Sequence, residues 1–108
     1  MQTGLTLVEH LKQHGFERKV YTDQDGQPVF FSRVFTTEEC PVFMETLVSD
    51  FAAAPDEIDP GTVTVEISES GDLLQFSCSE FDYWASCDPN TDEEGANSIL
   101  KEFGIQMP

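Results

Sequence analysis

The segment TVTVEISESGDLLQFSCSE, residues 62–80, decides the fold. Apolar and polar residues alternate on both sides of Ser70-Gly71, and alternation around a two-residue turn is typical of a β-hairpin. The pattern predicts antiparallel strands over residues 62–69 and 72–80. One face of this hairpin is apolar and the other is polar, so we expect the first to face a core and the second to face water.

The turn also sets which residues lie opposite each other, because a shift by one residue would move every side chain to the other face. The predicted pairs are Ile67 with Leu74, Val65 with Phe76, Val63 with Cys78, Thr64 with Ser77 and Glu66 with Gln75.

A second hairpin is predicted over residues 18–23 and 29–35, with a turn near Asp25-Gly26. A tight turn at that point places Tyr21 opposite Phe30, so that both faces of the hairpin carry large side chains. The alternation leaves open which aromatic ring faces the core. Pro28 indicates that the second strand reaches a sheet edge near the turn.

Three helices are predicted from a shared start signal, a Thr three residues before a Glu, which is the spacing of a capping box. The three pairs are Thr6 with Glu9, Thr36 with Glu39, and Thr91 with Glu94. The first helix should end near His14, before Gly15. Pro41 belongs in the first turn of a helix, which indicates an alternative cap for the second helix nearer Glu39 or Cys40.

Apolar residues recur at helical spacing in the second and third helices, which indicates that each packs one face on a sheet. The stripes are Phe43, Met44, Leu47, Val48 and Phe51, and Ala96, Ile99, Leu100 and Phe103. Gly104 and Ile105 then predict a Schellman ending for the third helix.

The elements follow the order α-β-β-α-β-β-α. We therefore expect a two-layer α+β fold, with a four-stranded antiparallel sheet built from two hairpins and helices mainly on one face. Residues 52–61 and 81–90 are expected to be irregular connections. At 108 residues, the chain is expected to form one acidic α+β domain over residues 1–108.

Composition indicates a folded cytoplasmic protein. The chain is 39% hydrophobic and has nine Phe, which is enough apolar material for a core. No run of about 18 apolar residues and no signal-peptide pattern occurs, so no membrane association is expected. Three cysteines without CxxC spacing argue against a disulfide framework or a zinc site.

Catalytic and metal motifs are absent from the sequence, including G-x-S-x-G, the P-loop and H-E-x-x-H. His10 and His14 have no third ligand at matched spacing, and the acidic run over residues 88–94 does not match a calcium loop.

Cys40 lies near a predicted helix start, but Glu38 and Glu39 oppose a thiolate there. We expect no enzyme activity, no cofactor and no metal.

Charge is divided unevenly along the chain. Residues 1–33 contain four bases and four acids, whereas residues 34–108 contain seventeen acids and only Lys101, which accounts for the net charge of −16. Such acidity repels itself within a compact domain. We therefore expect a negative surface that binds a positively charged partner.

The candidate surface combines carboxylates that could follow the charges of DNA, which lie about 1.7 Å apart along the axis, with two aromatic residues that could act as anchors. Same-face strand residues repeat at about 6.6–6.8 Å, so the predicted ladder is sparser than that of DNA. Trp84 could equally cover a sheet edge. The predicted partner-binding residues are Glu66, Glu69, Asp72, Glu80, Asp82, Tyr83, Trp84, Asp88, Asp92 and Glu93.

We expect a non-enzymatic inhibitor that occupies the nucleic-acid-binding surface of a basic protein by DNA or RNA mimicry, without binding nucleic acid itself. In size and acidity the chain is comparable with phage anti-restriction and anti-CRISPR proteins, although no residue motif links it to them. The alternatives are an acidic immunity or adaptor-type module, a salt-adapted domain without a charge-specific partner, and, least favoured, a small enzyme using Cys40 or a carboxylate pair. The neutral first third of the chain speaks against salt adaptation.

Overall fold

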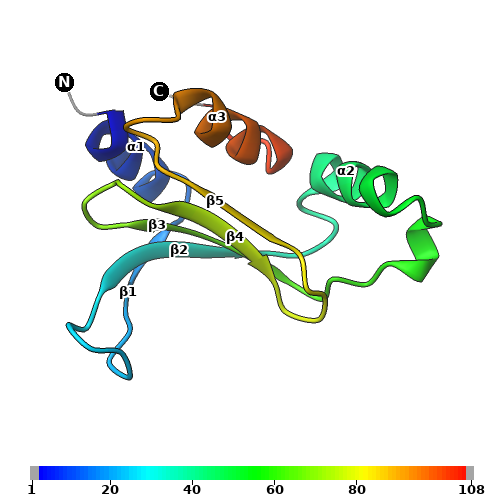
Figure 1. The fold of residues 1–108 in the computed structure, drawn as a ribbon, viewed down its shortest axis with the longest axis horizontal. Coiled ribbons are helices and arrows are strands. Elements are labelled where there is room, and N and C mark those ends of the chain that lie inside the picture. Colours follow the sequence, from blue (N-terminus) through cyan, green and yellow to red (C-terminus); the bar gives the residue numbers. More distant parts are fainter. Residues whose placement is uncertain (1–2, 107–108) are drawn as a thin grey trace.

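Five strands follow one another in sequence order and form an antiparallel sheet (Figure 1). This computed structural model describes residues 3–106 and has an α+β architecture. Its elements are α1 (Thr3–Lys12), β1 (Glu17–Val20), β2 (Val29–Phe35), α2 (Pro41–Phe51), the short 3₁₀ helix η1 (Pro55–Glu57), β3 (Val63–Ser68), β4 (Leu74–Cys78), β5 (Trp84–Cys87) and α3 (Glu93–Glu102).

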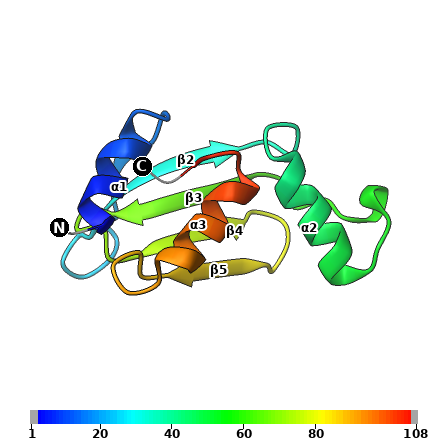
Figure 2. The ribbon, with the colours of Figure 1, turned by 90° about the horizontal axis from the view of Figure 1, so that it is seen from above.

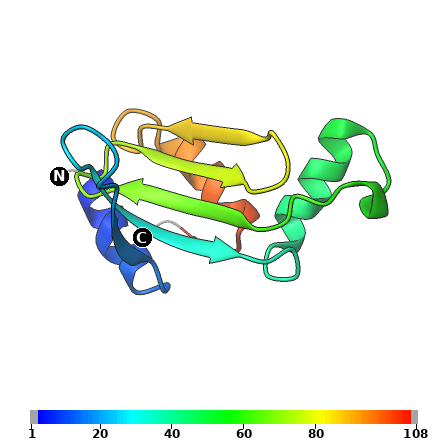
Figure 3. The same cartoon turned by 90° about the horizontal axis from the view of Figure 1, so that it is seen from below.

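The three α-helices lie on the same side of the sheet (Figures 1 and 2). In Figure 1, α1 lies over one end, α2 over the other, and α3 between them. The opposite face of the sheet has no helix in front of it (Figure 3). The core fills the space between the helices and the sheet, where the rings of Phe43 on α2 and Phe103 just after α3 stack at 5.0 Å.

The β3–β4 hairpin has the register that the sequence predicts. All five expected pairs are present, from Val63 opposite Cys78 to Ile67 opposite Leu74. Val63, Val65 and Ile67 are fully buried, which confirms the apolar face.

The prediction of four strands is wrong, because residues 84–87 form a fifth strand inside a segment that was expected to be irregular. The strand Trp-Ala-Ser-Cys is only four residues long. Its inward residues, Ala85 and Cys87, are small, so the apolar alternation that marks longer strands is weak here. Pairing with β4 supplies the strand character instead, with Ser77 opposite Trp84 and Leu74 opposite Cys87.

The register predicted for the first hairpin is also wrong. Lys19, not Tyr21, lies opposite Phe30, because the connection from β1 to β2 is longer than a two-residue turn. The amide of Gln24 donates to Tyr21 O, and the amide of Gln27 donates to Gln24 O, so two turns follow each other. Phe31 faces the core at 8% exposure, whereas Phe30 lies on the other face beside Tyr21.

The helix starts differ from the capping-box prediction. Thr6 lies inside α1, and Asp92 is the N-cap of α3. The N-cap of α2 is Cys40, which confirms the alternative that Pro41 indicates. Glu39 does accept hydrogen bonds from the amide and hydroxyl of Thr36, but these bonds close a turn that precedes α2. Pro41 explains why α2 begins after the Thr36–Glu39 turn, because proline is favoured at the first helical position that it occupies.

The glycine endings predicted for the first and third helices are confirmed, although α1 ends at Lys12, two residues before His14. Gly15 and Gly104 have φ angles of 89° and 74°, in the left-handed region that favours glycine. The amide of Phe16 reaches Leu11 O, and that of Ile105 reaches Leu100 O, which satisfies the last carbonyls of each helix. Within the described residues, no helix has the length and apolar character needed to cross a membrane.

Candidate protein-binding surface

The predicted partner-binding residues do not form one continuous ladder. They separate toward the two ends of β4, which is five residues long and so extends over about 17 Å. Residues Glu80, Asp82, Tyr83 and Trp84 form an α2-end group in and after the loop from β4 to β5. Residues Glu69, Asp72, Asp88, Asp92 and Glu93 form an α3-start group around the β3–β4 turn and the start of α3.

Glu66 belongs to neither group and does not face solvent as expected. Its side chain lies on the helix-free face of the sheet, yet the residue is only 6% exposed. The hydroxyl of Tyr21 donates to Glu66 Oε2, and Gln75 Nε2 donates to Oε1 at 3.5 Å. Tyr21 follows β1 in the long connection, so this connection covers the carboxylate.

Trp84 is the most exposed large hydrophobic residue of the α2-end group, at 66%. Its position opposite Ser77 places it on the helix-free face, since Phe76 and Ala85 face the core. Glu80 and Asp82 are exposed in the preceding loop. Residues 77–84 line a hollow of about 320 Å³ at this point. Two carboxylates and an indole therefore surround one small depression.

Tyr83 has a structural contact that the sequence did not reveal. Its hydroxyl donates to Asp50 Oδ2 at 2.8 Å, and its ring lies 5.9 Å from Phe43 and 5.5 Å from Phe51. Burial, together with the bond to the Asp50 carboxylate, raises the pKa of Tyr83 to about 12. Tyr83 thus holds the β4–β5 loop against α2 and positions its neighbours.

The loop is fixed at its other side as well. The amide of Glu80 donates to Pro60 O at 3.1 Å, and the amide of Thr62 donates to Ser79 Oγ at 2.9 Å. The rings of Phe51 and Phe81 meet edge to face at 4.9 Å. These contacts give Glu80 and Asp82 a defined place on the surface.

Several acids of the α3-start group have local structural partners. Asp92 Oδ1 accepts from the amide of Gly95 and caps α3. Asp88 is half-buried and accepts from the amide of Asn90 at 2.9 Å. Asp72 accepts from the hydroxyls of Ser70 and Ser68, and these bonds lower the pKa of Asp72. Helix and turn formation therefore account for these three carboxylates.

The remaining two members of that group differ in their surroundings. Glu69 lies 3.9 Å from Arg18, with both side chains 60% exposed. Glu93 is exposed in the first turn of α3, where a negative charge also favours the helix dipole. Arg18 on β1 thus reduces the negative potential beside Glu69.

Sequence reasoning missed a group of acids on and after α2 that extends the α2-end group. The signal is present in the sequence, because residues 50–59 contain four acids and no base, but the prediction treats residues 52–61 only as an irregular connection. The exposed acids of this region are Glu45, Asp50, Asp56, Glu57 and Asp59.

The described residues contain three ion pairs, and every base in them comes from the first third of the chain. Lys12 pairs with Glu9, Arg18 with Glu69, and Arg33 with Glu39. The bonds from Thr36 and Arg33 lower the pKa of Glu39. Glu80 and Asp82 take part in none of these pairs, so their charges face solvent.

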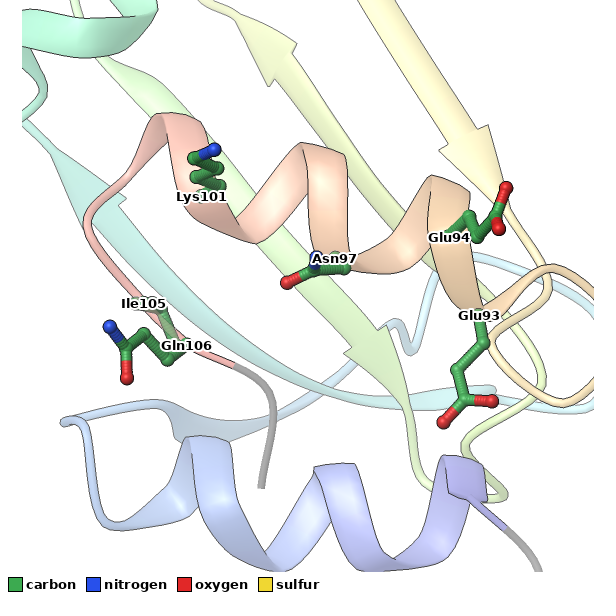
Figure 4. A pocket seen from close by; sticks show the side chains of 6 residues that line it. All are labelled: Glu93, Glu94, Asn97, Lys101, Ile105 and Gln106. Carbon is green, nitrogen blue, oxygen red and sulfur yellow. The ribbon is translucent and has the colours of Figure 1, made fainter.

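A hollow of about 540 Å³ lies along α3 and the segment that follows it (Figure 4). Its charged side chains do not converge. Glu93 and Glu94 point in different directions, and Lys101 lies two helical turns further along α3 (Figure 4). This arrangement does not bring an acid and a base together around one reacting atom.

Cys40 has the character of a buried hydrophobe, whereas Cys78 and Cys87 are half-buried. Cys40 is fully buried and donates to Thr36 O at 3.1 Å, and burial raises its pKa to about 11, with the Glu39 charge adding to the shift. A raised pKa keeps the nucleophilic thiolate scarce at neutral pH. The residues that the structure describes contain no group of three His, Cys, Asp or Glu side chains placed to hold a metal ion.

Comparisons with models of protein families, with curated proteins and with solved structures find no match.

Proposed function

We propose that this protein is a non-enzymatic acidic inhibitor that occupies the nucleic-acid-binding surface of a basic protein. Its α2-end group, together with the exposed acids on and after α2, takes the place of nucleic-acid phosphates. The partner is a protein rich in exposed Arg or Lys, and the chain itself does not bind nucleic acid.

The observation that carries this proposal is the exposure of the unpaired acids. Of the seventeen acids after Arg33, only Glu66 is buried, and only Asp88 and Glu102 are half-buried. Because the bases of the described ion pairs all precede Val34, little of this charge is neutralised within the chain. Exposed like charges destabilise a compact domain, and a basic partner removes that repulsion.

The α2-end group fits a basic partner better than the α3-start group does. Asp72, Asp88 and Asp92 are used in local hydrogen bonds, and Arg18 lies beside Glu69. By contrast, Glu80 and Asp82 are exposed on a loop that Tyr83 fixes to α2. A loop that is already held in place loses little backbone freedom on binding, which favours affinity.

Trp84 adds an apolar contact to the charged surface. An indole that is 66% exposed can stack on a guanidinium group, and such stacking is strongest for Trp. Arg residues that bind phosphates therefore find both a carboxylate and an aromatic face here. This combination favours a protein partner over simple adaptation to salt, which requires charge but no exposed indole.

The proposal is tested by affinity capture from a nuclease-treated lysate of the source organism at low salt. Three baits are compared: the wild-type chain, Glu80→Lys with Asp82→Lys, and Glu9→Lys with Glu17→Lys. Both double variants change the net charge equally. We expect the wild-type and Glu9/Glu17 baits to retain the same protein, the Glu80/Asp82 bait to lose it, and added duplex DNA or RNA to release it.

Polyglutamate at matched charge concentration is the control for release by any polyanion. Release by nucleic acid, at concentrations where polyglutamate has no effect, supports occupation of a nucleic-acid site. A captured protein that binds the added nucleic acid while it stays on the bait would overturn the proposal, as would equal loss on both variant baits.

A further inference from the structure

We infer that β5 is a docking edge, to which the basic partner adds an extended segment as a sixth strand of the sheet. This inference rests on the proposed function for the charge of the partner. It adds how the partner binds, through backbone pairing along residues 84–87.

The outer backbone groups of β5 follow from the hydrogen-bond pattern of the sheet. The amide of Cys78 donates to Tyr83 O at 3.3 Å, so this opposing pair is hydrogen-bonded. In an antiparallel ladder such pairs alternate, which makes Phe76 with Ala85 the next hydrogen-bonded pair. The amides and carbonyls of Trp84 and Ser86 therefore point away from β4. Within residues 3–106, no strand lies beyond β5 (Figure 3).

The two edges of the sheet differ in how well they are protected from pairing with another chain. The β1 edge reads Glu17-Arg18-Lys19-Val20, and charged side chains on an edge strand discourage pairing with other chains. The β5 edge reads Trp84-Ala85-Ser86-Cys87 and contains no charge. It is the open edge of the sheet, and adding a strand to such an edge is a common mode of peptide recognition.

Charge identifies the occupant as a basic segment. Glu80 and Asp82 precede β5, and Asp88, Asp92 and Glu93 follow it, so carboxylates stand at both ends of the edge. A second copy of this chain would bring a further net charge of −16 against the same acids. An extended segment with Arg or Lys at both ends instead pairs its charges with these carboxylates and places its central residues beside Trp84.

The length of β5 sets the spacing of those basic residues. Four residues of strand extend over about 13 Å, so the flanking bases should be separated by roughly four or five residues. Flexible basic arms of this kind also bind nucleic-acid phosphates. Strand addition is thus compatible with competition by nucleic acid.

The test uses a synthetic peptide, Arg-Arg-Val-Thr-Val-Thr-Arg-Arg, and a control with the same side chains but methylated backbone nitrogens at alternate positions. Binding to the full chain is followed by NMR titration and by amide hydrogen exchange. We expect the first peptide to slow exchange of the Trp84 and Ser86 amides at least tenfold. We expect the methylated peptide, which has equal charge, to bind at least tenfold more weakly.

Ser86→Pro removes one outward amide, and Ser86→Ala keeps it as the matched control. We expect only the proline variant to weaken binding of the first peptide. If Ser86→Pro does not fold, the methylated peptide and the exchange data decide. The inference is overturned if the first peptide does not bind, if it leaves Trp84 and Ser86 exchange unchanged, or if both peptides bind equally. If the capture experiment nevertheless finds a partner that nucleic acid releases, the proposed function stands and only strand addition is rejected.

Discussion

The hydroxyl of Tyr83 donates a 2.8 Å hydrogen bond to Oδ2 of Asp50 and so joins the residue before β5 to α2. Tyr83→Phe removes this bond and keeps the ring, and we expect it to lower the free energy of unfolding by about 1 kcal/mol. Asp50→Asn keeps an acceptor and should cost less. Urea unfolding of the three proteins checks this order, and equal stability of Tyr83→Phe and wild type would contradict it.

The same bond predicts a dependence on alkaline pH. The pKa of Tyr83 is raised from 10.0 to about 12, so the protonated hydroxyl stabilises the folded state. That contribution should be complete below pH 10 and should be lost as the pH rises through about 12. NMR titration of the Tyr83 ring measures the shift directly. A midpoint near 10 in the wild type would contradict both the burial of Tyr83 and its bond to Asp50.

Glu66 is predicted to act in folding rather than in partner binding. Glu66→Ala leaves the hydroxyl of Tyr21 and the amide of Gln75 without this acceptor, and we expect a loss of about 1–3 kcal/mol in unfolding free energy. Glu69→Ala, at an exposed position, should change stability by less than about 0.5 kcal/mol. Urea unfolding checks both. If Glu66→Ala keeps wild-type stability but loses partner binding, the result would instead support the continuous carboxylate ladder predicted from the sequence.

Asp72 is predicted to titrate below its usual range because Ser70 and Ser68 donate hydrogen bonds to its carboxylate. Its stabilising contribution should be present above the ordinary Asp pKa of about 3.9 and be lost as the pH falls through the lowered value. Ser70→Ala should raise the pKa of Asp72, whereas Ser98→Ala on α3 should leave it unchanged. Carbon-detected NMR titration of Asp72 measures both, and no rise in Ser70→Ala would contradict the account.

Charge reversal should act through position and not through net charge. Glu80→Lys with Asp82→Lys should weaken partner binding at least tenfold, about 1.4 kcal/mol, chiefly by slowing association at low salt. Glu9→Lys with Glu17→Lys should change affinity less than threefold, since these residues lie on α1 and β1. Surface plasmon resonance at several salt concentrations separates the two rates. Equal weakening by both variants would reject a localised acidic surface.

Asp92 is a poor site for testing charge reversal, because its side chain also supports the fold. From the sequence, Asp92 is one of several equivalent surface carboxylates, but its Oδ1 caps α3 through the amide of Gly95. Reversing its charge would remove the cap, at a cost of about 1 kcal/mol, and confuse folding with binding. Glu80 and Asp82 are cleaner sites because they cap no helix.

The sequence predicts the β3–β4 hairpin down to its register because a turn at Ser70-Gly71 and strict alternation leave one solution. It does not predict β5, whose inward residues Ala85 and Cys87 are too small to mark a strand and which depends on pairing with β4. The first hairpin fails for a related reason. Its connection contains two successive turns, and the Asp25-Gly26 signal alone does not specify its length.

The charge asymmetry of the candidate surface can be predicted from the sequence alone. The structural role of each carboxylate cannot. Glu66 is buried because Tyr21 reaches it from a connection forty-five residues away in sequence. Tyr83 likewise depends on Asp50, which lies on another element. Such long-range contacts leave no local pattern, so residues that bind a partner and residues that support the fold look alike in the sequence.

Displacement of nucleic acid from a basic protein by this chain can be measured by fluorescence anisotropy. A labelled duplex DNA or RNA is bound to the purified captured partner, and the unlabelled chain is then added. We predict that anisotropy falls to the value of the free nucleic acid as the chain saturates the partner, and that the Glu80→Lys, Asp82→Lys variant requires at least tenfold more protein. Anisotropy that stays constant or rises as the chain binds would show a ternary complex and contradict the claim.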